Sequence, residues 1–213
     1  MLIGMHSAEA PSSIWQAVAV GDAAVPNVTV VNPKSGGSCY EYTGWRNADN
    51  EVCCNAHNMG AHTIFDASIA VGFWMRRTGV FDGYQAASYF KGNGQIRWRL
   101  YANGSLQLLT RSASGYALHT LINQLNDSWH HLAWSLSITN TTVDISVYVD
   151  MSKIQTIRLP NSASWFNRSL SASIGTNHVW PNVAPGAKIY YDNYRIGTTV
   201  ADIMPRAPRI TRF

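Results

Sequence analysis

The stretch that decides the fold is WHHLAWSLSITNTTVDISVYVD, residues 129–150. Apolar and polar residues alternate over residues 131–137 and again over residues 143–150. This period of two is typical of β-strands that bury one face and expose the other. Residues 129–150 therefore predict two neighbouring strands joined as a hairpin.

The same alternation occurs elsewhere, over residues 68–76 and 189–196 and most clearly over residues 95–101. In that last segment Ile96, Trp98 and Leu100 form one face, and the opposite face consists of Arg97, Arg99 and Tyr101. The Asn103-Gly104 pair that follows is a strong signal for a tight turn, so residues 95–110 predict a second hairpin.

Turn signals recur along the chain at intervals too short for helices, and no segment of 12 or more residues has a convincing helical period. The economical solution is a two-sheet antiparallel β-sandwich. We expect the fold class to be all-β, with the sandwich at residues 14–203. Residues 1–13 and the basic residues 204–213 are expected to be extended N- and C-terminal arms.

Composition excludes two classes of partner. The chain has 213 residues, 13% of them charged, with a formal net charge of +4. Its basic residues are scattered, apart from Arg206, Arg209 and Arg212 near the end, whereas a nucleic-acid binder usually has a denser basic stripe. No apolar run approaches the roughly 18 residues of a membrane span. We expect neither nucleic acid nor a bilayer as a partner.

The exterior of the molecule carries several sequence signals. No secretion signal is visible, so any such segment either was removed or is not needed, as for a virion protein made in the cytosol. Asn-x-Ser/Thr sequons, typical of glycosylated surfaces, occur at Asn27, Asn103, Asn126, Asn140 and Asn167. We therefore expect an extracellular, cell-surface or virion location.

Three cysteines leave at least one thiol outside any internal disulfide. Cys39 bonded to Cys53 or Cys54 would close a loop of about 15 residues, worth roughly 3 kcal/mol in chain entropy. Cys53, Cys54, His57 and His62 form an alternative set of zinc ligands. Adjacent cysteines in an extended chain point to opposite sides, which favours the disulfide over the zinc site.

These segments resemble one family. Residues 129–134 followed by residues 143–150 are similar to the laminin-G or concanavalin A-like pattern Trp-His-His-Val-Ala, a hairpin and a Leu-Tyr-Val-Asp strand. Residues 191–203 resemble its closing strand and short acidic segment, and residues 38–44 and 65–76 resemble its early strands. The likeness spans about residues 36–203 and implies a jelly roll, whose members bind glycans, bind proteins or hydrolyse glucans.

The resemblance also implies a metal. Relatives hold calcium through oxygen ligands, and Asp192 matches an acidic position of the family. Asp22 or Asp82 could supply a second carboxylate. Calcium is thus a possible cofactor, and the alternative is that Asp192 only bonds to a neighbouring loop.

For catalysis, the resemblance implies two Glu on one strand, acting as nucleophile and acid. The chain has only Glu9, Glu41 and Glu51, and no two of them have strand spacing. We therefore expect no enzyme, and glycoside hydrolysis ranks third among the functions considered.

Two other functions are expected in its place. The first is a non-catalytic, lectin-like recognition module that binds glycan or protein at an outer surface. The second is a structural subunit of a larger assembly, such as a minor virion or capsid protein or an extracellular filament, whose arms dock on neighbouring copies. Arg97, Arg99 and Tyr101 on a strand face are the candidate ligand-binding residues, together with Tyr84, His178 and Trp180 in loops.

Overall fold

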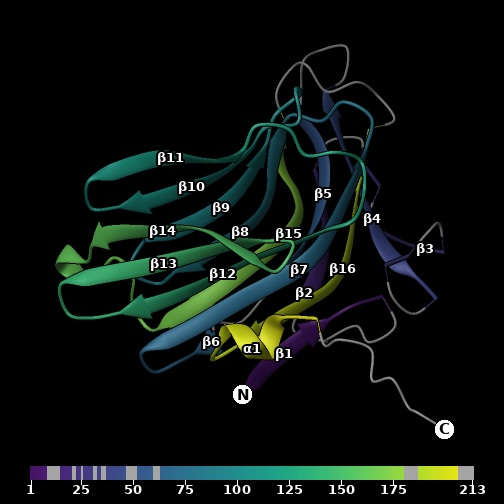
Figure 1. The fold of residues 1–213 in the computed structure, drawn as a ribbon. Coiled ribbons are helices and arrows are strands. Elements are labelled where there is room, and N and C mark those ends of the chain that lie inside the picture. Colours follow the sequence, from purple (N-terminus) through teal and green to yellow (C-terminus); the bar gives the residue numbers. More distant parts are fainter. Residues whose placement is uncertain are drawn as a thin grey trace, which may run out of the picture.

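The computed structural model describes residues 1–8, 15–20, 23–24, 26–30, 33–34, 37–46, 52–59, 63–179 and 187–205. These residues form two antiparallel sheets of eight strands each, stacked face to face (Figure 1). The expected all-β, two-sheet sandwich is confirmed. A 3-10 turn, η1 (Ser162–Ser164), and a four-residue helix, α1 (Val200–Ile203), are the helical elements of the described chain.

Sheet A has the order β3-β4-β16-β7-β12-β13-β14, and β1 also pairs with β16. Its strands are β1 (Leu2–His6), β3 (Asn27–Thr29), β4 (Cys39–Arg46), β7 (Ser68–Thr78), β12 (His130–Ile138), β13 (Thr142–Val149), β14 (Ser152–Pro160) and β16 (Lys188–Gly197).

Sheet B has the order β11-β10-β9-β8-β15-β5, with β2 pairing with β5 and β6 with β15. Its strands are β2 (Trp15–Val20), β5 (Val52–Met59), β6 (Thr63–Ile64), β8 (Gly83–Phe90), β9 (Gln95–Leu100), β10 (Leu106–Ser112), β11 (Gly115–Ile122) and β15 (Ser169–Val179). Strand β4 pairs with β16 through its first half and with β5 through its second, so it joins the two sheets along one side.

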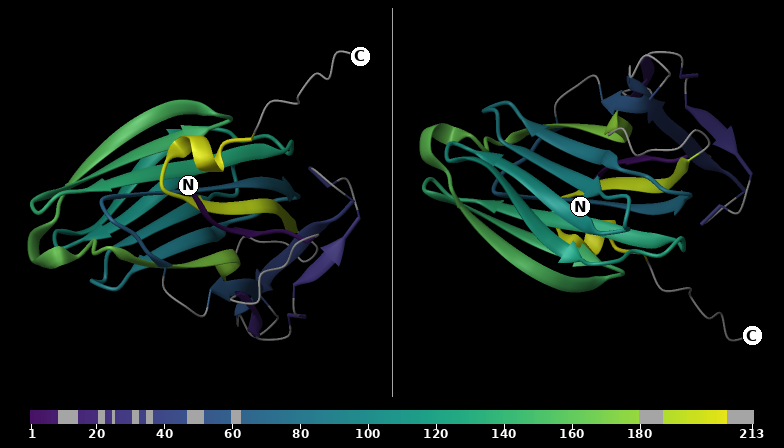
Figure 2. Two further views of the ribbon diagram at one scale, coloured as in Figure 1. Left: turned by 90° about the horizontal axis from the view of Figure 1, so that it is seen from below. Right: turned by 90° about the horizontal axis from the view of Figure 1, so that it is seen from above.

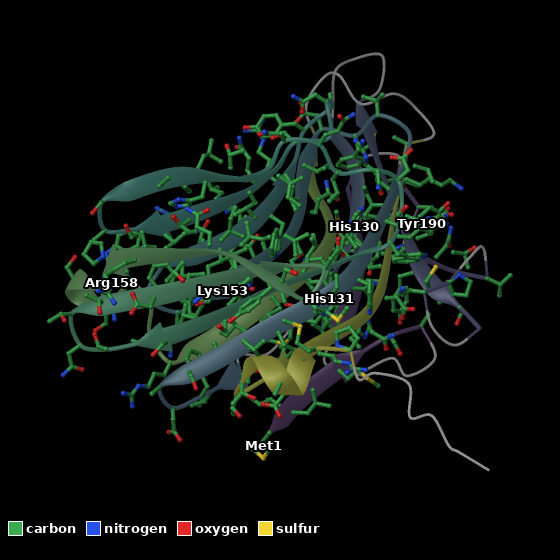
Figure 3. The ribbon with its side chains drawn as sticks, in the orientation of Figure 1. Met1, His130, His131, Lys153, Arg158 and Tyr190 are labelled. Carbon is green, nitrogen blue, oxygen red and sulfur yellow. The ribbon has the colours of Figure 1, made fainter. Side chains whose placement is uncertain are left out.

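The hairpin predicted from residues 129–150 is present. Strands β12 and β13 pair from Leu132 opposite Val149 to Ile138 opposite Val143. Apolar residues of both strands, among them Trp134, are buried in the core between the sheets. The two histidines that open the hairpin have different surroundings (Figure 3). His130 forms a hydrogen bond between its Nδ1 atom and the Asp150 carboxylate at 2.8 Å. His131 is buried, and its ring meets the Trp74 ring in a T-shaped contact.

The outer face of sheet A is partly covered by α1. Ile203 is 1% exposed and packs on Ala70 and Ala133, at the position where Gly72 has no side chain. An added Cβ at Gly72 would lie 3.1 Å from the Ile203 Cδ1 atom. Figure 2 shows the helix lying across the strands of this sheet when the molecule is viewed from below.

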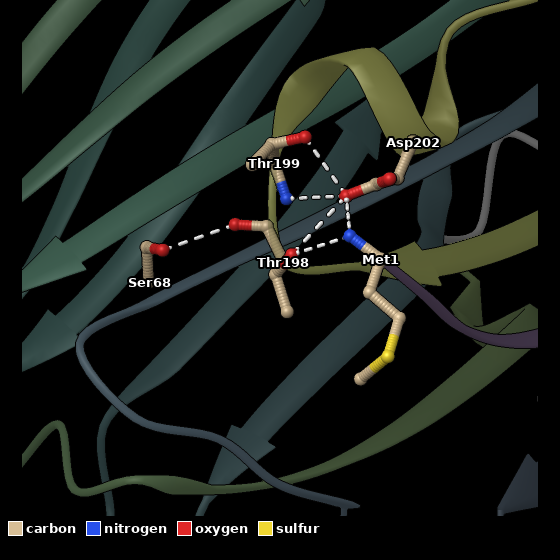
Figure 4. A network of polar contacts seen from close by, with 5 residues as sticks. All are labelled: Met1, Ser68, Thr198, Thr199 and Asp202. Atoms are coloured by element: carbon tan, nitrogen blue, oxygen red, sulfur yellow. Dashed lines mark hydrogen bonds and ion pairs between the residues drawn. The ribbon is translucent and has the colours of Figure 1, made fainter.

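Residues 1–13 were expected to be an arm, but residues 2–6 form β1 and pair with β16 in sheet A. The α-amino group of Met1 lies 2.7 Å from both the Asp202 carboxylate and the Thr198 hydroxyl (Figure 4). The same Asp202 oxygen accepts hydrogen bonds from the backbone N–H and the hydroxyl of Thr199. Residues 9–14 and 206–213 lie outside the described chain, so the rest of both expected arms stays a prediction.

A cluster of aromatic rings fills the space where β1, β2, β4 and β5 meet. The His6 ring stacks on Trp15 and Tyr40, and it meets His57 edge-on with 5.0 Å between the ring centres. His57 is hydrogen-bonded through Nδ1 to the Tyr42 hydroxyl at 2.8 Å. Burial lowers the pKa of both histidines to about 4, and the nearby His57 also lowers that of His6. Both rings are therefore neutral in the folded protein at neutral pH.

This cluster predicts acid sensitivity between pH 6.5 and 4. In that window the unfolded chain binds protons at His6 and His57, with an ordinary pKa of about 6.5, and the folded chain does not, so stability falls as pH falls. His6→Phe keeps the ring contacts but cannot titrate. Between pH 7 and pH 5, the free energy of unfolding of this variant should fall by about 1–2 kcal/mol less than that of wild type.

Urea unfolding at the two pH values measures this difference, with the exposed Lys153→Gln as the control. The free energy of unfolding of each protein at pH 5 is compared with that of the same protein at pH 7, so a general loss of stability in His6→Phe does not affect the result. Equal losses for wild type and His6→Phe would contradict the prediction.

Candidate functional site on sheet B

The outer face of sheet B carries a group of arginines. In β9, Ile96, Trp98 and Leu100 are at most 1% exposed and point into the core. Because side chains alternate along a strand, Gln95, Arg97 and Arg99 lie on the outer face. We use the term arginine face for the outward side chains of β8 to β11: Tyr89, Gln95, Arg97, Arg99, Gln107, Leu109, Arg111, Tyr116, Leu118 and Thr120.

Strand register brings three arginines together on this face. In the predicted hairpin, β9 and β10 pair so that Arg97 is opposite Leu109 and Gln95 is opposite Arg111. Arg111 is thus a diagonal neighbour of Arg97, roughly 7–8 Å away between backbones, and Arg99 is at a similar distance along the strand. Three guanidinium groups therefore occupy two adjacent strands.

Each guanidinium group lies over an aromatic ring. The Arg99 group is 3.8 Å from the centre of the Tyr101 ring, and the Arg97 group is 5.5 Å from that of Tyr89. Arg111 lies 5.2 Å from the centre of the Tyr116 ring and 5.4 Å from that of Trp165. Contacts of a cation with a ring face are favourable and restrict the rotamers of these long side chains. The face is therefore organised before any ligand binds.

One carboxyl group lies beside these arginines. The Asp82 Oδ1 atom is 3.7 Å from the Arg99 Nη2 atom, and the Asp82 side chain is only 9% exposed. Burial raises the pKa of Asp82, while the positive charge of Arg99 opposes that rise. Among the described acidic residues, Asp82 is the one that contacts the arginine face, so a pair of carboxyl groups is absent from the described part of this face.

The sequence placed some of these residues correctly. Arg97 and Arg99 lie together on the face opposite the core, as expected. Tyr101, predicted for the same face, packs on Arg99. Tyr84 and His178 were expected in loops, which is wrong, because they belong to β8 and β15. Register places Tyr84 opposite both Arg99 and His178, in one row across three strands. Trp180 lies outside the described residues, and the ligand-binding role of the whole set stays a prediction.

Sequence analysis missed several residues of this face. Arg111 and Tyr116 were not identified. The turn has three residues, 102–104, and this pairs Arg111 with Gln95, whereas a two-residue turn at Asn103-Gly104 would have paired Arg111 with Ile96. Asp82 was considered only as a calcium ligand. Its contact with Arg99 joins a loop residue to a strand, and no local pattern predicts such a contact.

The predicted disulfide is wrong. Cys39 and Cys53 are both buried, but Cys53 is opposite Trp45, six residues along β4 from Cys39 and so roughly 20 Å away. Cys54 is opposite Gly44, which is still roughly 16 Å from Cys39. A disulfide requires Cα atoms less than about 7 Å apart. The short sequence separation concealed this distance, because β4 and β5 meet near the end of β4.

Two of the three predicted calcium ligands, Asp82 and Asp192, belong to different parts of the sandwich, and the alternative pair of Asp192 with Asp22 stays a prediction. Asp192 lies in β16 of sheet A, opposite Trp74, whereas Asp82 contacts Arg99 of sheet B. Asp22 and the zinc candidate His62 lie outside the described residues. Within the described ranges, no three His, Cys, Asp or Glu side chains form a group that could hold a metal ion.

Four of the five sequon asparagines, at positions 27, 103, 126 and 140, are exposed, and Asn167 is half-buried. The side-chain oxygens of Asn103, Asn126 and Asn167 each accept a hydrogen bond from the backbone N–H of the residue two positions further along the chain. Their glycosylation stays a prediction. Within the described ranges, no helix has the length and apolar character of a transmembrane span.

Comparison with solved structures shows that the fold is a jelly-roll sandwich. A glycoside hydrolase family 16 endo-glucanase from Bacteroides ovatus superimposes with a TM-score of 0.62 at 12% identity, over 91% of this chain and 99% of that one. A laminarinase from Flavobacterium sp. UMI-01 gives a TM-score of 0.64 at 10% identity, over 92% of this chain and 99% of that one.

A third similar structure is botulinum neurotoxin type C, a protein that interacts with two ganglioside molecules. Its TM-score is 0.58 at 12% identity, over 85% of this chain, and this chain spans 42% of the toxin chain. No known family and no curated protein matches the sequence. The likeness therefore establishes the fold, and the finer resemblance to laminin-G domains stays a prediction.

These neighbours correct the functional expectation. We expected a non-catalytic recognition module or an assembly subunit, and no enzyme. Several structures that superimpose over most of the chain are glycoside hydrolases, which contradicts that expectation. The chain has no two Glu at strand spacing, and that pattern does not reveal a single buried carboxyl group such as Asp82 beside a cation.

The geometry of the site predicts how Arg99 controls Asp82. Arg99→Gln removes the positive charge that opposes burial, so the pKa of Asp82 should rise further above its ordinary value. The measurement is an NMR titration of the Asp82 side-chain carboxyl carbon in both proteins. Lys153→Gln removes one positive charge from β14 of the other sheet and should leave the Asp82 titration unchanged. A lower or unchanged pKa in Arg99→Gln would refute this coupling.

Proposed function

We propose that this protein acts on carbohydrate polymers as a glycoside hydrolase, with the glycan lying along the arginine face. The observation that carries the proposal is the presence, on one sheet face, of a buried carboxyl group beside guanidinium groups and aromatic rings. The likeness of the fold to an endo-glucanase and a laminarinase supports the same class of activity.

The face has the surface that sugars require. Rings of Tyr, together with apolar side chains, pack against the C–H faces of pyranoses, and fixed polar groups bond to their hydroxyls. Tyr116 is 59% exposed and Leu118 is 49% exposed at the edge of the face. Gln95 is opposite Arg111 and Gln107 is opposite Arg99, so their amide side chains lie beside the arginines and supply both donors and acceptors.

Asp82 is the candidate general acid. Cleavage of a glycosidic bond requires a proton on the departing oxygen, and a carboxyl group with a raised pKa holds that proton closer to neutral pH. Burial raises the pKa of Asp82 in this way. Asp82 also precedes β8 directly, so the start of a rigid strand fixes its position at the end of the sheet.

Tyr101 is the candidate nucleophile. Most glycoside hydrolases use a second carboxyl group to attack the sugar or to activate water, but some use a tyrosine hydroxyl instead. Arg99 contacts both Tyr101 and Asp82, which places these two residues around one guanidinium group. Arg99 is then the residue that positions the two reacting groups.

The experiment is a hydrolysis assay on purified protein, in which the release of reducing ends is measured. The substrates are β-1,3-glucan, mixed-linkage β-glucan, mucin O-glycans and acidic polysaccharides. We expect cleavage of at least one of these polymers. Asp82→Asn keeps the shape but cannot donate a carboxyl proton, so it should lower the rate at least about 100-fold.

Tyr101→Phe should lower the rate by a similar factor. Asp66→Asn, a change of the same kind at an exposed residue between β6 and β7, should have the activity of wild type. Failure of the wild-type protein to cleave any substrate would refute the proposed activity. Full activity in folded Asp82→Asn would remove Asp82 from the mechanism.

A further inference from the structure

We infer that the glycan on the arginine face is anionic, carrying sulfate esters or carboxylates. This inference rests on the proposed function for the location of the site. It adds the class of substrate, which the fold alone leaves open because the same architecture hosts many ligands.

The first argument is the charge balance of the face. Arg97, Arg99 and Arg111 lie on adjacent strands, and among the described acidic residues Asp82 contacts this group through Arg99. Other described carboxyl groups contact cations elsewhere: Glu41 contacts Lys188, Asp127 contacts Arg77, Asp144 contacts Arg158, Asp150 contacts His130 and Asp202 contacts Met1. The described face therefore has an excess of positive charge.

The opposite side of the sandwich is organised differently. On sheet A, both Asp144 oxygens accept hydrogen bonds from Arg158, at 2.6 and 2.8 Å. Lys188 lies 2.9 Å from Glu41 on the same sheet. Figure 3 labels Arg158 and Lys153, which both belong to β14 of sheet A. Sheet A thus places carboxyl groups beside Arg158 and Lys188, whereas the arginine face places three guanidinium groups on two adjacent strands.

The second argument is the chemistry of the cations. Arg97 lies within about 8 Å of both Arg99 and Arg111, measured between backbones. Like charges on such neighbours repel, and an anionic ligand relieves that repulsion where a neutral sugar does not. Guanidinium groups match sulfate and carboxylate oxygens with two parallel hydrogen bonds. Each of these groups is already held against a ring, so little conformational freedom is lost when the ligand binds.

The third argument is the arrangement of charge and apolar surface. Arg111 is opposite Tyr116, and Leu118 is opposite Leu109, so the cations border a strip of apolar side chains across β10 and β11. A sugar polymer offers the same combination of apolar ring faces and acidic substituents. A compact anion such as phosphate would use the cations alone.

The test is direct binding at 0.05 M and 0.15 M NaCl, by calorimetry, to three polymers. Dextran sulfate carries sulfate esters, polygalacturonate carries carboxylates, and dextran is neutral. We expect at least one anionic polymer to bind ten-fold or more tightly than dextran, and to bind less tightly at the higher salt concentration. The two acidic polymers identify which substituent the site prefers.

Arg97→Gln and Arg111→Gln should each weaken binding of the anionic polymer about ten-fold, because each removes one charge-assisted contact. Circular dichroism checks that each variant is folded. If one of the two variants folds poorly, the other still tests the inference. Lys153→Gln and Arg158→Gln remove the same charge from β14 and should bind within about two-fold of wild type.

If the β14 variants weakened binding of the anionic polymer as much as the arginine-face variants do, the polymer would be attracted by net charge alone, and the inference would be overturned. Binding of dextran as tight as that of the anionic polymers would also overturn it. The two proposals fail separately. Arginine-dependent binding without cleavage of any polymer supports the anionic site and refutes the hydrolase. Asp82-dependent cleavage of a neutral glucan, without anionic binding, refutes the anionic site and leaves the hydrolase.

Discussion

The structure depends on the burial of two sheet faces against each other. Each strand of the sandwich must present apolar side chains inward at every second position, and the residues between them are then forced outward. In β9, burial of Ile96, Trp98 and Leu100 forces Arg97 and Arg99 onto the outer face. A shift of one residue in register would place these cations in the core, so the packing that stabilises the fold also positions the candidate site.

The two outer faces differ in the side chains they carry. Sheet A is partly covered by α1, which packs through Ile203, and its strands pair Asp144 with Arg158. The arginine face on sheet B keeps three guanidinium groups against aromatic rings, with the buried Asp82 at one end. We had expected a non-catalytic surface, and the hydrolases among the structural neighbours contradict that expectation. The candidate activity therefore rests on Asp82 and its surroundings rather than on a glutamate pair.

Sequence reasoning succeeded where the signal is local and failed where it is not. The 129–150 hairpin and the outward position of Arg97 follow from alternation and turn residues, which act over a few positions. Tyr84 and His178 were assigned to loops because both strands carry irregular pairing just there, which disrupts the alternation. The disulfide prediction failed because spacing along the chain says nothing about which part of β4 lies beside β5.

The sequence by itself therefore determined the class of the fold, the strands with clear alternation and the side of β9 that faces outward, because a period of two needs no knowledge of distant residues. Only the tertiary structure decided which strands are neighbours. That choice brought Arg111 beside Arg97 and placed Asp82 against Arg99. Contacts of this kind depend on long-range register and on the path of loops, which packing of the whole molecule determines.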